Sequence, residues 1–414
     1  MPNPDRKIAD GLEWECPPLI LFIDDVSGNT SKQWNVHYSC YLSNGALPRA
    51  TVEKESNIRF VATSPHASPM EIMQAICDEI QKMGAYTPLK VWDSVHQRYI
   101  MIRPWIVFLP GDNPMQAELC SHIGLNSNHF CRICHVGGTK AHKESDIGYT
   151  ELLRKGRPRT PKETRDAVIK QLIMLTHAGV SKRIQTEMTT DGVKDSLATP
   201  VITRLVTVGK ALHKRTATRA PLSPKDVNAH LYAELLKKRR TDIINPLLSM
   251  PGLDVHQDTP VEPLHTHLLG VVKYFWAQTM WILEKSGNFS TFQANLNSLQ
   301  KAGLHIPNIM AEYMCRYRGS LIGKHFKTIC QVMAFAVCGL VEDIIQKLWH
   351  AIGRLTTLIW ETEINDMKTY TVGTHSSGRV VCKCTDKLGN RRHSSKQLRT
   401  SMILLQSSVQ ASSP

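Results

Sequence analysis

The chain has 414 residues, of which 42% are hydrophobic, and this content excludes wholesale disorder. Fifty Lys and Arg residues against 36 Asp and Glu residues give a formal net charge of +14, which favours a polyanionic partner such as nucleic acid. The N-terminal sequence has no apolar signal-peptide core, and the most apolar later stretch is too short for a bilayer span. We therefore expect an intracellular protein with no membrane partner, whose 11 cysteines are reduced thiols or metal ligands.

Residues 15–125 predict the first part of an α/β fold, after an N-terminal extension over 1–14. The unbroken apolar run at Leu19–Ile23 predicts a strand buried on both faces. "VHYSCYLSNG" and "IRFVATS" predict further strands, and "SPMEIMQAICDEIQKMG" predicts a helix with Ser68 as its cap. "YIMIRPWIVFLPGD" resumes strand character, and Pro104 divides it into two pieces.

Acidic residues follow the two strongest apolar runs. Asp24 and Asp25 come where the first strand is expected to leave its sheet, and Asp112 follows the second run. A helix is predicted directly afterwards, with Asn113 as N-cap and Gln116 completing a capping box. Carboxylates at neighbouring strand ends suit Mg²⁺ or Mn²⁺ in phosphoryl transfer. The alternative is structural, because Asp also favours turns and helix starts.

A cysteine–histidine cluster opens the next segment, 126–255, which is predicted to be a Cys/His knuckle followed by a helical, basic insertion. A CxxC pair with further Cys and His residues nearby favours structural zinc over the alternative, a redox pair. The expected zinc ligands are Cys120, Cys131, Cys134 and, ahead of His135, His122. "RKGRPRTPKETR" predicts a basic, proline-broken linker after the cluster.

Residues 256–370 predict a mainly helical half, and 371–414 predict a Ser/Arg-rich, mostly disordered tail. Glu262 and His265 are three residues apart and so share a helix face, as metal ligands or, alternatively, with Glu262 in a capping box that starts at Thr259. Basic residues in two runs are candidate phosphate contacts, although a charge run is also typical of a solvated face. They are Lys237, Lys238, Arg239, Arg240, Arg316, Arg318, Lys324 and Lys327.

Several long motifs appear in an order that resembles the transposases of fungal CACTA-like DNA transposons, the Plavaka group. The motifs are "LILFIDDVSGNTSKQWN", "RFVATSPHASPME", "FLPGDNPMQAELCSH…FCRICHVGG", "INPLLSMPGLDVHQDTPVEPLHTHLLGVVKYFW" and "RYRGSLIGKHFK". The resemblance covers residues 12 to about 370. It implies an RNase H-like core, a mixed sheet with flanking helices, interrupted by the zinc-knuckle and helical insertion. It also implies a nuclear protein that acts on double-stranded DNA, self-associates and has no small-molecule substrate.

The resemblance assigns roles to individual residues. Asp24 matches the first catalytic aspartate and Asp112 the second, both holding Mg²⁺ or Mn²⁺. The Cys131–Cys134 pair matches a metal-knuckle-like element. Glu262 with His265 matches a [Cys/Asp]-x-x-His signature, with Glu in its first position.

The third catalytic acid of the family has no match in this sequence. After Tyr370 the chain departs from the family pattern, so we expect a C-terminally truncated transposase. Glu361, Glu363 and Glu262 are weak substitutes. Because a two-ion clamp needs its carboxylates, the sequence predicts impaired cutting and joining of DNA. The alternative is a non-catalytic, zinc-containing remnant that binds DNA or another protein.

Overall fold

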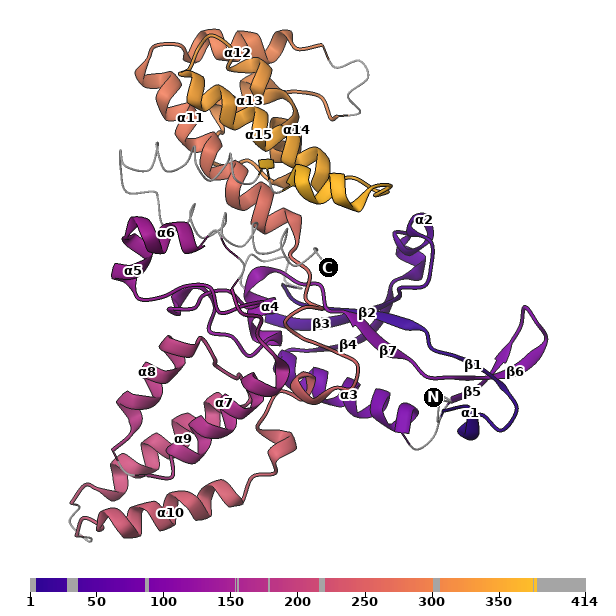
Figure 1. Ribbon diagram of the computed structural model, residues 1–414, viewed down its shortest axis with the longest axis vertical. Coiled ribbons are helices and arrows are strands. Elements are labelled where there is room, and N and C mark those ends of the chain that lie inside the picture. The colour runs from indigo at the N-terminus through magenta and orange to yellow at the C-terminus, as the bar shows by residue number, and fades with distance from the viewer. Residues whose placement is uncertain are drawn as a thin grey trace. The chain divides into compact units, whose positions relative to one another are not determined.

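The structure is a computed structural model in which the chain divides into two compact units, Met1–Pro260 and Val261–Pro414 (Figure 1). The first unit combines strands with helices and the second is helical, so the molecule is of mixed α/β class. Within the described part of the chain, no helix is both long and apolar enough to cross a membrane. The structure describes residues 5–27, 36–85, 89–152, 154, 156–177, 179–215, 220–300, 306–374 and 376–377.

The larger sheet of the first unit has four strands in the order β4-β3-β2-β7. Their bounds are β2 (Pro18–Ser27), β3 (Val36–Asn44), β4 (Arg59–Ser64) and β7 (Trp105–Phe108). The first three strands pair antiparallel, whereas β7 runs parallel to β2. A parallel pair needs a long crossover connection, which here contains helix α3 (Pro69–Ala85).

Strand β2 is buried on one face only, so the prediction of burial on both faces is wrong. Leu21 and Ile23 are fully buried and belong to the main core, whereas Phe22 between them is 36% exposed. Successive side chains of a strand point to opposite faces, and on the second face of β2 Phe22 and Val26 are exposed. On this face Phe22, Tyr41 and Phe60 form a row across three strands, with ring centroids 6.4 and 5.9 Å apart.

Helix α3 begins at a complete capping box, as the sequence predicts. The hydroxyl of Ser68 accepts a hydrogen bond from the backbone N–H of Glu71 (3.3 Å), and the Glu71 carboxylate accepts one from the N–H of Ser68 (2.7 Å). The helix buries Met73 and Cys77 in the same hydrophobic cluster as the inner residues of β2. This packing fixes the central strand that carries Asp24.

A second, three-stranded sheet has the order β1-β6-β5. Its strands are β1 (Glu13–Glu15), β5 (Leu89–Asp93) and β6 (Arg98–Ile102). The predicted division at Pro104 is confirmed, because β6 ends before it and β7 begins after it, in the other sheet. Proline cannot donate to a strand ladder, which explains the change of sheet at this residue.

The helices between residues 161 and 236, together with α3 and the helix at 113–119, share one buried core with the larger sheet. Leu21 in β2 and Leu231 in α10 belong to one continuous cluster of buried side chains. Helices of the predicted insertion therefore belong to the same hydrophobic cluster as the sheet. The helices are α1 (Asp5–Ile8), α2 (Arg49–Val52), α4 (Asn113–Leu119), α5 (Lys140–Glu144), α6 (Asp146–Leu152), α7 (Pro161–Met174), α8 (Ser181–Asp191), α9 (Ala198–Leu212) and α10 (Pro224–Leu236).

The second unit packs its helices around buried tryptophans. The indole N–H of Trp276 donates to the carbonyl of Arg318 (3.1 Å), and that of Trp349 donates to the hydroxyl of Thr279 (3.0 Å). Residues 367–374 are helical, and residues 378–414, most of the tail predicted to be disordered, lie outside the described residues. The elements are a π-helix (Leu264–Val272), α11 (Lys273–Lys285), α12 (Phe289–Ser298), α13 (Ala311–Arg316), α14 (Gly323–Ala336) and α15 (Asp343–Ile359).

Candidate functional site

Asp24 and Asp112 each follow, by the same number of residues, one member of a registered pair on two neighbouring parallel strands. Ile20 of β2 is in register with Phe108 of β7, and each aspartate follows its member of this pair by four residues (20 to 24 and 108 to 112). β7 ends at Phe108, whereas β2 continues and pairs Asp24 with Ser39 of β3. The expectation that β2 leaves its sheet at Asp24 is therefore wrong, but the aspartate does lie past the end of its parallel neighbour.

Asp112 is itself the N-cap of α4, in place of the predicted Asn113. Its carboxylate accepts a hydrogen bond from the backbone N–H of Met115 (2.8 Å). Gln116 does not close a capping box; its buried side chain donates to the carbonyl of Pro260. Asp112 caps in place of Asn113 because its carboxylate reaches the backbone N–H of Met115, and Asp and Asn cap helices about equally well. One carboxylate oxygen of Asp112 is thus fixed and the other stays available.

The carboxylates of Asp24, Asp25 and Asp112 lie close enough to repel one another, which favours a bound cation. Burial raises the pKa of Asp24, and repulsion from the carboxylates of Asp112 and Asp25 raises it further. The backbone N–H of Asp25 donates to Asp24 (2.8 Å) and partly offsets these effects. Mg²⁺ and Mn²⁺ are bound through one or two carboxylates completed by water and phosphate oxygens, so Asp24 and Asp112 fit such an ion.

The candidate third acids, Glu262, Glu361 and Glu363, belong to the second unit, whereas Asp24 and Asp112 belong to the first. Among the described residues, no three or more His, Cys, Asp or Glu side chains are arranged to hold a metal ion. Glu361 and Glu363 are exposed after the end of α15. Glu262 instead accepts from the backbone N–H of His265 (2.7 Å) and contacts Nδ1 of its ring (2.9 Å).

Glu262 caps the following helix, as the alternative prediction states, but not through a capping box that starts at Thr259. The hydroxyl of Thr259 donates to the carbonyl of Val255 (2.8 Å), so Thr259 does not cap the helix that follows. Glu262 performs the capping itself by accepting from His265. The predicted shared face of Glu262 and His265 is confirmed as a direct contact.

Residues 156–159 hold the Cys/His segment, so the prediction of a linker here is wrong. Cys134 forms an isolated β-bridge with Pro158, and the backbone N–H of His135 donates to the carbonyl of Arg157 (2.8 Å). Gly156 must lack a side chain, because a Cβ there would lie 2.8 Å from the nitrogen of Val136. Residues 156–159 therefore hold the Cys/His segment through backbone hydrogen bonds.

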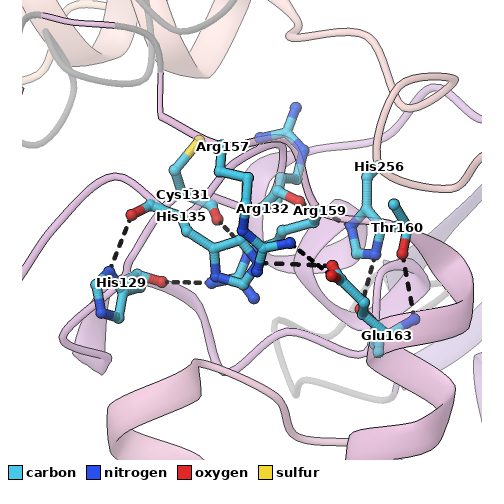
Figure 2. Close-up of polar contacts among 10 residues, drawn as sticks. His129, Cys131, Arg132, His135, Arg157, Arg159, Thr160, Glu163 and His256 are labelled. Atoms are coloured by element: carbon cyan, nitrogen blue, oxygen red, sulfur yellow. Dashed lines mark hydrogen bonds and ion pairs between the residues drawn. The ribbon is translucent and has the colours of Figure 1, made fainter.

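Arg159 is the centre of the cluster (Figure 2). It is only 2% exposed, and its guanidinium donates to the carbonyls of Cys131 (2.9 Å) and His129 (3.0 Å). Its backbone N–H donates to the carbonyl of Ile133 (3.0 Å). Burial, with the positive charge of Arg159, lowers the pKa of His135 to about 4. The side chain of Arg159 thus holds the start of the CxxC turn, and its backbone N–H holds Ile133 within the turn.

Cys131 and Cys134 are buried side by side. Their mutual hydrogen bond, followed by burial, raises the pKa of the Cys134 thiol. Cys120 points elsewhere and donates to the carbonyl of Val255 (3.0 Å). His122 uses both ring nitrogens, with Nδ1 accepting from the N–H of Gly124 (3.0 Å) and Nε2 donating to the carbonyl of His129 (3.1 Å).

The four expected zinc ligands are therefore not brought together. Zinc in structural sites takes four tetrahedral ligands, and the described residues supply two paired thiols. Cys120 and His122 are held by backbone groups of other segments, which explains why they do not converge on the pair. The thiols fit half of a zinc site, and zinc stays a prediction.

A second layer of polar side chains, not anticipated from the sequence, supports the cluster. His256 is buried between two partners, with Nδ1 donating to the carbonyl of Arg132 (2.8 Å) and Nε2 accepting from the hydroxyl of Thr164 (2.9 Å) (Figure 2). Glu163 pairs with Arg157 and lies 3.9 Å from His135 Nε2. His256 lies in one of the family-like motifs, yet nothing in its local spacing marks it as a partner of the knuckle.

The predicted phosphate contacts divide into paired and unpaired residues. Three of them form ion pairs: Lys237 with Glu234 (2.8 Å), Arg239 with Asp242 (2.9 Å) and Arg318 with Glu284 (2.6 Å). The others with described side chains, for which the described part of the chain shows no ion pair, are Lys238, Arg316, Lys324 and Lys327. The side chain of Arg240 lies outside the described residues.

Neither the known protein-family models nor the curated proteins match this chain. Its chemistry is therefore argued from two features of the first unit. One is a pair of carboxylates beyond the end of β7, which suits a hard divalent cation. The other is a buried Cys/His turn held by Arg159.

Proposed function

We propose that this chain is a transposase-derived DNA-binding protein whose RNase H-like core ancestrally cut and joined DNA by two-metal phosphoryl transfer. The placement of Asp24 and Asp112, four residues past one registered pair on parallel strands, carries the proposal. The mixed sheet with α3 against it supports an RNase H-like core. The ordered motifs that resemble Plavaka-group transposases support the same ancestry.

Each aspartate has a defined part in this proposal. Asp112, fixed by its cap bond to Met115, offers its second oxygen to the cation, and half-buried Asp24 supplies the opposing carboxylate. When bound, Mg²⁺ or Mn²⁺ polarises a phosphodiester and activates the attacking hydroxyl. The third acid of the resembled family has no match in this sequence, and two carboxylates hold a two-ion clamp less firmly than three, so we expect the activity to be impaired.

The partner in this proposal is double-stranded DNA in the nucleus, bound through basic side chains. The net charge of +14 supplies the electrostatic attraction, together with Lys238, Lys324 and Lys327, for which the described residues show no ion pair. Structural zinc on Cys131 and Cys134 would add to the bonds that Arg159 already makes. Metal analysis of the purified chain, with Cys131→Ser beside it, tests the zinc.

The experiment that tests the proposal is cleavage of supercoiled plasmid by the purified chain in Mg²⁺ and in Mn²⁺. Asp24→Asn and Asp112→Asn are the controls, since both keep the size and hydrogen-bonding oxygen of the side chain. Slow nicking that requires a divalent ion and disappears in both variants supports the proposal. Nicking that survives in both variants would assign the chemistry elsewhere and overturn it.

One observation favours a second candidate, a non-catalytic remnant that binds DNA or another protein. Within the first unit, the described residues bring no third carboxylate into a metal-binding group with Asp24 and Asp112. A remnant of this kind binds DNA but nicks no plasmid in either metal. That result would retain the ancestry and remove the enzyme activity.

A further inference from the structure

A row of aromatic rings lies on the surface of the second unit. Tyr313 in α13 and Tyr317 at its C-cap are 38% and 48% exposed, and their ring centroids are 5.0 Å apart. His325 extends the row on the other side of Tyr313, with centroids 5.6 Å apart. These three rings are named the ring row. Exposed aromatic rings in contact are suited to stacking against flat partners.

Backbone hydrogen bonds fix the rings of the ring row in place. His325 is buried, and its Nδ1 accepts a hydrogen bond from the backbone N–H of Ile322 (3.1 Å), which fixes the ring at the start of α14. Tyr313 and Tyr317 are four residues apart, with the N–H of Tyr317 donating to the carbonyl of Tyr313 (2.8 Å). The rings are therefore presented in one arrangement before any ligand binds, which lowers the entropic cost of binding.

Positive charge flanks the ring row on both sides. The Arg316 guanidinium lies 5.7 Å from the Tyr317 ring, and the charge of Lys324 contributes, after burial, to lowering the pKa of His325. Arg318 is engaged by Glu284, and Glu312 is an exposed carboxylate on α13. Beside the ring row, Arg316 and Lys324 carry positive charge and Glu312 carries negative charge. This net positive charge favours an anionic ligand.

We propose that the ring row binds unpaired nucleotides of single-stranded DNA, with Tyr313 and Tyr317 stacking on bases and Arg316 and Lys324 contacting phosphates. Only unpaired bases expose the faces that stack on aromatic rings, whereas a duplex presents its phosphates and hides those faces. The inference rests on the proposed function, because DNA that is cut and joined exposes unpaired ends. It names the form of DNA that the second unit recognises.

The test uses the full chain, a labelled oligo-dT strand, the same length of duplex and an RNA strand, with affinity measured by fluorescence anisotropy. Tyr313→Ala with Tyr317→Ala is expected to weaken single-strand binding about 10-fold or more and to change duplex affinity less than two-fold. Phe at both positions keeps the stacking face and restores the affinity. A strand carrying 2-aminopurine reports stacking directly and should lose its signal change in the Ala variants alone.

Further variants separate folding from binding. Tyr317→Ala alone removes the more exposed ring, and Arg316→Gln should lower the slope of log affinity against log salt by about 0.7. Tyr232→Ala, an exposed tyrosine of α10, is the matched control. Unchanged single-strand affinity in the double Ala variant overturns the inference, as does an equal loss on duplex. Tighter binding of RNA than of DNA, or a change in self-association alone, overturns it as well.

Failure of the inference and failure of the proposed function give different results. Metal-dependent nicking that needs Asp24 and Asp112, with no effect of the tyrosines, overturns the ring-row inference alone. Tyrosine-dependent binding of a single strand without any nicking leaves the inference standing and removes the enzyme activity. Absence of all DNA binding overturns both.

Discussion

Arg159 is a charged side chain whose burial is compensated by hydrogen bonds to backbone carbonyls. Its bonds to Cys131 and His129 join the CxxC turn to residues 156–159. We expect Arg159→Met, which keeps the apolar stem and removes the donors, to lower the free energy of unfolding by about 2–4 kcal/mol, because buried carbonyls lose their partner. Chemical denaturation measures this difference.

The neighbouring Arg157 is the control for this prediction. Its side chain is 62% exposed and pairs with Glu163 at the surface. Arg157→Met should cost less than about 1 kcal/mol, as exposed ion pairs do. If Arg159→Met unfolds at the same denaturant concentration as the unmodified chain, Arg159 does not hold the cluster.

Replacement of Asp24 by Asn should raise the stability of the metal-free chain at neutral pH, although it removes a carboxylate that metal-dependent activity needs. Its pKa is raised above the ordinary value of 3.8, so its favourable contribution is complete below pH 3.8 and is lost as pH rises through the folded-state pKa. Without divalent metal, Asp24→Asn should therefore be more stable than the unmodified chain at pH 7. The gain in free energy of unfolding should shrink as pH falls toward 3.8.

Divalent metal should reverse this order. Mg²⁺ binds the folded carboxylate pair and stabilises the unmodified chain by mass action, and Asp24→Asn loses one of the two ligands. Unfolding curves at several pH values, with and without millimolar Mg²⁺, provide the measurement. A pH-independent difference between the two proteins would show that Asp24 is not the group that titrates.

At the scale of elements, the start of α4 combines a structural and a chemical task in one residue. Asp112 caps the helix through Met115 and faces Asp24 across the strand ends. Asn and Asp cap helices about equally well, whereas Ala does not. Asp112→Asn should therefore keep the stability, and Asp112→Ala should lose about 1 kcal/mol.

Cleavage separates the two tasks. Any metal-dependent nicking should fall at least about 100-fold in both variants, since the charge beside the transition state is gone in each. Thermal unfolding and plasmid nicking on the same samples give both readouts. Nicking in Asp112→Asn at the level of the unmodified chain would restrict Asp112 to capping.

Local chemistry accounts for the elements that the sequence predicts. The capping box of Ser68 and Glu71 and the break at Pro104 are decided within a few residues, and both are confirmed. Which face of β2 is covered depends on its neighbours in space, so Leu19–Ile23 alone did not reveal it. The proximity of Asp24 and Asp112 was foreseeable because both follow apolar runs that became parallel neighbours.

The Cys/His cluster resisted prediction for a related reason. A proline-broken basic stretch resembles a solvated linker, and only the carbonyls of Cys131 and His129 make a buried Arg159 favourable. Likewise, the backbone groups that hold Cys120 and His122 come from other segments of the chain. Such long-range partners leave no periodicity in the sequence.

At the scale of the whole molecule, the excess of positive charge should govern association with DNA. With a net charge of +14, we expect the logarithm of duplex affinity to fall linearly with the logarithm of salt concentration. Each phosphate contact contributes about 0.9 to the slope. Lys238→Gln removes a side chain with no ion pair in the described part of the chain and should lower the slope by about this amount.

Lys170→Gln is the matched control, because Lys170 pairs with Glu187 (2.8 Å) and belongs to neither basic run. Its slope should equal that of the unmodified chain. Titrations between 50 and 300 mM salt on one duplex decide among the three proteins. Salt-independent binding would mean that the chain recognises its partner through apolar contacts, because released counterions are the signature of phosphate contacts. An equal change in both variants would trace the attraction to overall charge rather than to the run that contains Lys238.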